Sequence, residues 1–101
     1  MRKDASNMSK PVGKPNGTVI KVAAGTSSAA SAAIADKVLF VRIVADQNVY
    51  IEFGSSPTAT ASTHYLPANQ VEYFKVQTDG TKVAALRAGG TSGNVWISEI
   101  V

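Results

Sequence analysis

The longest strand-like stretch of the sequence covers residues 37–53, where β-branched and other apolar residues dominate. Residues 38–45 are nearly all apolar, as in a strand covered on both faces, whereas residues 49–53 alternate between apolar and polar. Between them, residues 46–48 (Asp-Gln-Asn) have the composition of a turn. Because so short a connection cannot carry a crossover to a parallel neighbour, the pattern predicts an antiparallel hairpin at the centre of the core. Its predicted core-facing positions are Val49, Ile51 and Phe53.

Strand patterns also occur on both sides of this hairpin. They lie at residues 18–23, 64–66, 70–76, 82–87 and 95–101. Turn-forming residues separate them, most clearly the Thr-Asp-Gly-Thr of residues 78–81. About eight short antiparallel strands, with turns every 8 to 12 residues, are typical of an all-β sandwich or barrel. The sequence therefore predicts the all-β class, with no long helix and no internal repeat.

Residues 27–35 (SSAASAAIA) allow two interpretations. Alanine favours helix, but the run is short, is interrupted by serine and has no wide apolar stripe at helical spacing. We predict an extended strand of small residues, which would let another backbone approach closely, for example that of a neighbouring subunit. A flexible Ala/Ser linker is the alternative.

Charge divides the chain into two parts. The first 21 residues contain five basic and one acidic residue, or +4, whereas the remaining 80 contain five basic and six acidic, or −1. Residues 1–17 have no periodic apolar pattern, so we expect an extended basic N-terminal arm followed by a β domain over residues 18–101. This distribution argues against a nucleic-acid-binding face on the β body. The candidate attachment residues of the basic segment are Arg2, Lys3, Lys10, Lys14 and Lys21.

Composition limits the chemistry further. The chain has no cysteine, which excludes disulfide and thiol chemistry and fits assembly in a reducing cytoplasm. No segment approaches the ~18 consecutive apolar residues that span a bilayer, and no apolar run follows the basic start, so we expect a soluble, unprocessed protein. With 101 residues and a surface rich in Ser, Thr and Ala, a homodimer or homotrimer is expected.

Few residues are candidates for catalysis or metal binding. His64 is the single histidine and no G-x-S-x-G motif accompanies it, so a surface or interface role is favoured over a hydrolase triad. Paired carboxylates for glycoside chemistry would need two of Glu52, Glu72 and Glu99 within ~10 Å across a groove. Their plainer role is that of solvated or salt-bridged strand positions, paired for example with Arg42, Arg87 and Lys75. The sequence indicates no metal, no cofactor and no enzymatic activity.

Two further features have open interpretations. Arg42 interrupts an apolar strand, where an unpaired buried charge would cost several kcal/mol, so it needs either a carboxylate partner or an interface. Tyr50, Tyr65 and Tyr73 could form a platform for sugar or single-stranded nucleic acid, but are more often core edges or subunit contacts. The Ser/Pro/Thr-rich residues 54–63 are long enough to project from the end of a sandwich.

Three stretches of the sequence resemble a known group of proteins. They are residues 51–76 (IEFGSSPTATASTHYLPANQVEYFKV), residues 80–83 (GTKV) and the closing VWISEIV. They resemble a widespread group of small tailed-bacteriophage virion proteins, in which an aromatic-Gly strand end, a Ser-Pro-Thr loop and a hydrophobic-Pro-Ala turn precede a terminal strand. The resemblance covers residues 18–101 and does not extend to the arm.

This resemblance implies a jelly-roll-like β-sandwich of the capsid decoration or cement kind. Such a protein would bind the major capsid protein at the capsid surface of a virion and stabilise the shell without catalysis. Two other roles compete with it: an appendage that holds host carbohydrate at residues 54–63 and the nearby tyrosines, and a head-to-tail connector or tail protein, which would share the fold and the virion. Copy number in the particle separates these classes.

Overall fold

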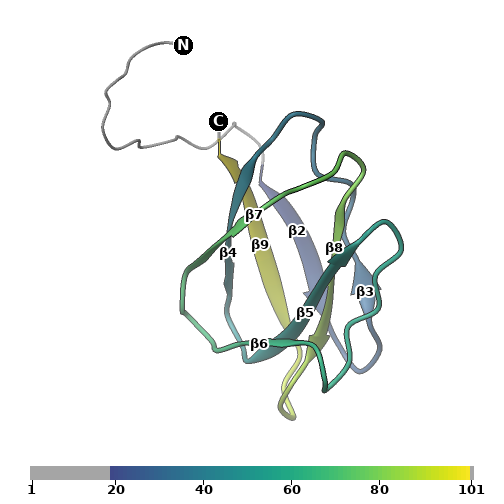
Figure 1. The fold of residues 1–101 in the computed structure, drawn as a ribbon. Coiled ribbons are helices and arrows are strands. Elements are labelled where there is room, and N and C mark those ends of the chain that lie inside the picture. The colour runs from purple at the N-terminus through teal and green to yellow at the C-terminus, as the bar shows by residue number, and fades with distance from the viewer. Residues whose placement is uncertain (1–18, 101) are drawn as a thin grey trace.

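The computed structural model describes residues 19–100, which form eight strands and no helix (Figure 1). In chain order the strands are β2 (Ile20–Ala24), β3 (Ala29–Ala30), β4 (Phe40–Ala45), β5 (Val49–Gly54), β6 (His64–Leu66), β7 (Glu72–Lys75), β8 (Lys82–Arg87) and β9 (Gly93–Ile100). The predicted all-β class and strand number are confirmed. The predicted arm, residues 1–17, lies outside the described residues.

The strands form two antiparallel sheets of four strands each. The first sheet has the order β2-β9-β4-β7 and the second has the order β3-β8-β5-β6. The chain-distant pairs are nested: β2 pairs with β9, β3 with β8, β4 with β7, and β5 with β6. The chain therefore folds like one long hairpin whose successive strand pairs alternate between the two sheets (Figure 1).

The predicted hairpin between β4 and β5 is wrong, because these strands lie in different sheets. β4 pairs with β7 and β9, whereas β5 pairs with β6 and β8. Residues 46–48 thus form an arch from one sheet to the other. Four Cα–Cα steps between Ala45 and Val49 span up to about 13 Å, enough for the ~10 Å between packed sheets.

Polar side chains hold this arch in place. The Asp46 carboxylate accepts a hydrogen bond from the Asn94 amide of β9 at 2.7 Å, and the Asn48 side chain accepts one from the Ala68 amide at 2.8 Å. The Asn48 carbonyl also accepts the Ala88 amide, which directly follows β8, at 2.9 Å. The turn-forming residues were located correctly, but they connect two sheets rather than two neighbouring strands.

The core lies between the sheets and draws on both. Alternate residues of each long strand are buried in one cluster, as expected when each sheet covers only one face of the other. The cluster includes Val41, Ile43, Val95 and Ile97 of the first sheet and Val49, Ile51, Leu66 and Val83 of the second. Ile51 is fully buried, and Phe53 is half-buried against the cluster, so the predicted inward face of β5 is confirmed.

The small-residue segment does bring two backbones close together, but within one chain. Only Ala29 and Ala30 form a strand, opposite Ala85 and Ala84 of β8. The Ser31 hydroxyl then accepts the Val83 amide at 2.9 Å, replacing the backbone carbonyl that would continue the ladder. Ser31 is buried, so the segment is packed against β8 and is not a free linker.

Two connections shape the rest of the domain. In the turn before β8, Gly80 has a φ of 80°, a left-handed conformation that glycine adopts at little cost. The loop between β5 and β6 was predicted to project, yet its Ala59 is buried and donates its amide to the Ser28 hydroxyl at 2.8 Å. This bond ties the loop to the segment preceding β3.

Candidate protein-binding face and cleft

The side of the first sheet that points away from the core is the main candidate site, and we call it the outer face. It comprises the outward residues of four strands: Lys21 and Ala23 of β2, Asn94, Trp96, Ser98 and Ile100 of β9, Phe40, Arg42 and Val44 of β4, and Tyr73 and Lys75 of β7. β4 was predicted to be covered on both faces. Instead, one of its faces is buried while Phe40 on the other is 47% exposed.

Strand register arranges nine of these 11 residues in three rows, each of which sets a cation beside an aromatic ring, and leaves Ala23 opposite Asn94 as a fourth pair. Across the sheet, the rows are Lys75–Phe40–Ile100, Tyr73–Arg42–Ser98 and Val44–Trp96–Lys21. Directly opposite residues of neighbouring strands lie within contact range on one face of a sheet. In the third row the Lys21 Nζ lies 5.8 Å from the centre of the Trp96 ring, a cation–π distance.

The outer face is positively charged although the described part of the chain is neutral. Residues 19–100 contain six basic and six acidic side chains. Lys21, Arg42 and Lys75 lie on the outer face, and its 11 positions include no carboxylate. The face therefore carries +3, and the remaining described residues together carry −3.

Exposed apolar residues gather at the same face. Tyr73 is 64% exposed. Val19, directly before β2, and Val71, directly before β7, are exposed as well and continue the outward alternation of those strands. Aromatic side chains and arginine are the groups that most often anchor protein–protein contacts. This combination is typical of a protein-binding surface.

The structure shows the surroundings of Arg42, the charged residue that interrupts the apolar strand β4. It is half-buried on the outer face between Tyr73 and Ser98, and no carboxylate of the described residues forms an ion pair with it. The position needs no buried ion pair, because the guanidinium lies on the outer side of the sheet. The expected carboxylate partner is not found among the described residues, and the expected interface stays a prediction.

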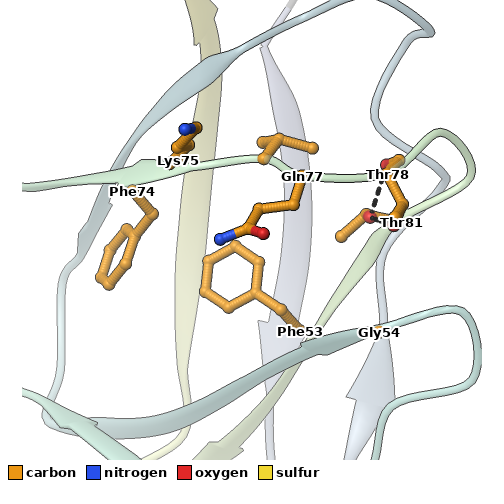
Figure 2. Close-up of a pocket in the computed structure, with 8 residues that line it drawn as sticks. Phe53, Gly54, Phe74, Lys75, Gln77, Thr78 and Thr81 are labelled. Carbon is orange, nitrogen blue, oxygen red and sulfur yellow. Dashed lines mark hydrogen bonds between the residues drawn. The ribbon is translucent and has the colours of Figure 1, made fainter.

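A second candidate site is a shallow cleft of about 490 Å³ where β6 stops covering β5. It lies between the end of β5, at Phe53, and the segment of Phe74 to Thr78 that leads out of β7. Figure 2 shows the Gln77 side chain extending over the Phe53 ring, with the Phe74 ring beside it. The two phenylalanine rings are 5.1 Å apart between centres.

The cleft combines apolar rings with neutral hydrogen-bonding groups. The Thr81 hydroxyl donates to the Thr78 carbonyl at 2.8 Å, and the two hydroxyl oxygens lie 3.2 Å apart. Lys75 is the charged residue of the lining. Aromatic rings with a few amide and hydroxyl groups are the groups that bind small neutral polar ligands such as sugars.

The titratable candidates from the sequence do not form a catalytic group. His64 Nε2 lies 2.9 Å from Glu72 Oε1, and the His64 ring meets Phe74 edge to face. Glu72 therefore pairs with a histidine, not with the cations expected from the sequence. Glu52 lies in the second sheet and accepts the Phe53 amide, whereas Glu99 in the first sheet accepts the Ala35 amide at 2.7 Å.

The three tyrosines do not form one platform. Tyr50 and Tyr65 are neighbours on the second sheet, with ring centres 5.7 Å apart, whereas Tyr73 belongs to the outer face of the first sheet. The basic candidates are likewise divided. Lys21 is described and lies in β2, so it belongs to the sheet; Arg2, Lys3, Lys10 and Lys14 lie outside the described residues.

Residues 19–100 contain no group of three or more side chains that could hold a metal ion, and no helix among them is long and apolar enough to cross a membrane. Comparison with known proteins found no matching family model and no similar curated protein or solved structure.

Proposed function

We propose that this chain is a non-enzymatic structural protein of a tailed-bacteriophage virion, which binds the major capsid protein and stabilises the shell from its surface. The sequence resemblance of residues 18–101 suggests this class of protein. The observation that carries the proposal is the outer face, which no other strand of residues 19–100 covers, because a stabilising protein needs an exposed surface suited to another protein.

We further propose that the sandwich is a jelly roll. The support is the nested pairing of β2 with β9, β3 with β8, β4 with β7 and β5 with β6. Rolling one long antiparallel hairpin over two sheets produces the strand orders β2-β9-β4-β7 and β3-β8-β5-β6. Jelly rolls of eight strands recur in viral capsid proteins.

A shell-stabilising role requires many copies, so copy number is the first test. Quantitative mass spectrometry of purified particles should give hundreds of copies per virion, matching the number of capsomer junctions. A few copies to a few dozen would indicate a connector, tail or appendage protein and would contradict the proposal.

A homodimer or homotrimer is the expected state of the protein in solution. Sedimentation at capsid-like concentrations measures this oligomeric state.

The cleft supports a second candidate, an appendage that binds host carbohydrate. Its rings, Phe53 and Phe74, offer apolar faces for a sugar ring, and Gln77 offers an amide for sugar hydroxyls. Glycan-array binding by the native protein that is lost on Gln77→Ala would favour this candidate. Absence of glycan binding, together with a high copy number, would leave the capsid role.

A further inference from the structure

We infer that the outer face is a docking surface for an acidic, partly apolar protein surface. Under the proposed function that surface belongs to the capsid shell, so the identity of the partner rests on that function. The inference about the partner's chemistry rests on the outer face alone.

The arrangement of the three rows indicates this chemistry. Each cation has an aromatic neighbour. When a carboxylate of the partner protein reaches Lys75, Arg42 or Lys21, the partner's backbone beside that carboxylate therefore lies over an aromatic ring. Arg42 lies in the central row, and no carboxylate of the described residues pairs with it. A carboxylate from a partner would supply the missing charge in a bidentate geometry that suits guanidinium groups.

Charge also discriminates among the possible occupants. The arm is a poor occupant, because residues 1–18 carry four basic residues and one acidic residue. A second copy paired face to face would bring +3 against +3. Nucleic acid fits less well than protein, because three cations are fewer than the 6 to 10 phosphate contacts of typical DNA-binding proteins. The complementary occupant is therefore an acidic protein.

The size of the face limits the strength of one contact. Four strands about 4.8 Å apart, each rising about 3.4 Å per residue over about five residues, cover roughly 300–400 Å² in plan. Stable protein interfaces bury about 800 Å² per partner. The outer face alone therefore gives a weak contact, and tight attachment requires additional contact area or several copies bound together.

The first experiment measures shell binding by charge-reversed and apolar variants of the full-length protein. On the outer face these are Arg42→Glu with Lys75→Glu, and Phe40→Ser with Tyr73→Ser. Matched controls on the second sheet are Lys82→Glu and Tyr65→Ser. Circular dichroism and unfolding curves for every variant ensure that only folded proteins are compared.

Empty shells of the phage that encodes this chain serve as the target. At low salt each outer-face double variant should bind about tenfold more weakly than wild type, and the controls should stay within about twofold. The charge-dependent part of the loss should shrink at 1 M salt, where the Debye length is about 3 Å. Equal binding by wild type and both outer-face variants would overturn the inference but leave the proposed function standing.

A second experiment needs no capsid. Amide NMR shifts of the full-length protein are followed during titration with a soluble copolymer of glutamate and leucine, and with single-stranded DNA as a competing class. Shifts in β4, β7 and β9 with the copolymer that disappear in Arg42→Glu with Lys75→Glu would support the inference, even if wild type fails to bind shells and the proposed function falls. Shifts confined to residues outside the first sheet, stronger binding of DNA to the face, or self-association through it would each refute the inference.

Discussion

Replacing Gly93 by alanine tests the arch between the two sheets. A Cβ on Gly93 would meet the Asp46 carboxylate and would lie 2.7 Å from Cγ and 2.8 Å from Cβ of Gln47. The Gln47 Cβ cannot move without moving the backbone of the arch. Asp46 is held as well, because its carboxylate accepts the Asn94 amide at 2.7 Å.

Two opposing effects decide the sign of this change. Gly93 has no positive φ, so alanine in an open strand position would stabilise the protein by about 0.5–1 kcal/mol. Overpacking usually costs about 1–3 kcal/mol, and weakening a hydrogen bond to a charged acceptor costs about 1.5–3 kcal/mol. Because the hydrogen bond is weakened and not lost, we expect a net loss of about 1–3 kcal/mol, or about 4–24 °C in Tm for a chain of this size.

Urea unfolding followed by the fluorescence of Trp96, the one tryptophan of the chain, measures this loss. Gly90→Ala is the matched control in the same connection, because nothing lies within 4 Å of its new methyl group. Gln47→Gly in the Gly93→Ala background should recover part of the loss. If Gly93→Ala is as stable as Gly90→Ala, the arch does not pack on β9 and the reasoning is wrong.

Four further predictions use simpler assays. Ile51→Ala should cost about 2–5 kcal/mol in urea unfolding because Ile51 is fully buried, and a loss below 1 kcal/mol would contradict the core assignment. Lys37→Gly should be neutral or stabilise by up to about 1 kcal/mol, because Lys37 has a φ of 74°; a clear loss would contradict this conformation. His64→Gln should change the unfolding free energy by less than about 1 kcal/mol, since its hydrogen bond with Glu72 is exposed; a larger loss would indicate a structural role. Deleting residues 1–17 should leave the far-UV spectrum and cooperative unfolding intact, because these residues have no periodic apolar pattern that could supply a face to the core; loss of the folded state would show that the arm belongs to the domain.

Local pattern was enough to locate most strands. β8 covers residues 82–87 as predicted, and β6 covers residues 64–66, because alternation and turn residues act over only a few neighbouring positions. The same alternation correctly assigned the inward face of β5. These features depend on side-chain period and turn chemistry, which a short segment carries by itself.

The partners of each strand could not be obtained in this way. A strand that exposes one apolar face to the core has the same alternation whether its neighbour along the chain lies beside it or across the core. Three turn residues after β4 fit a hairpin and an arch equally well, because both are within reach of the backbone. The choice depends on β9, about 50 residues away, whose Val95 and Ile97 pair with Ala45 and Ile43 in place of β5.

The outer face was missed for the same reason. Its cations and aromatic residues were visible along the sequence, but they come from four strands that are adjacent only in the folded sheet. The outward positions of these strands, taken one strand at a time, contain three cations and no carboxylate. They do not reveal that Arg42 of β4 lies beside Tyr73 of β7. Register between distant strands, set by packing of the whole core, brings these groups together on one surface.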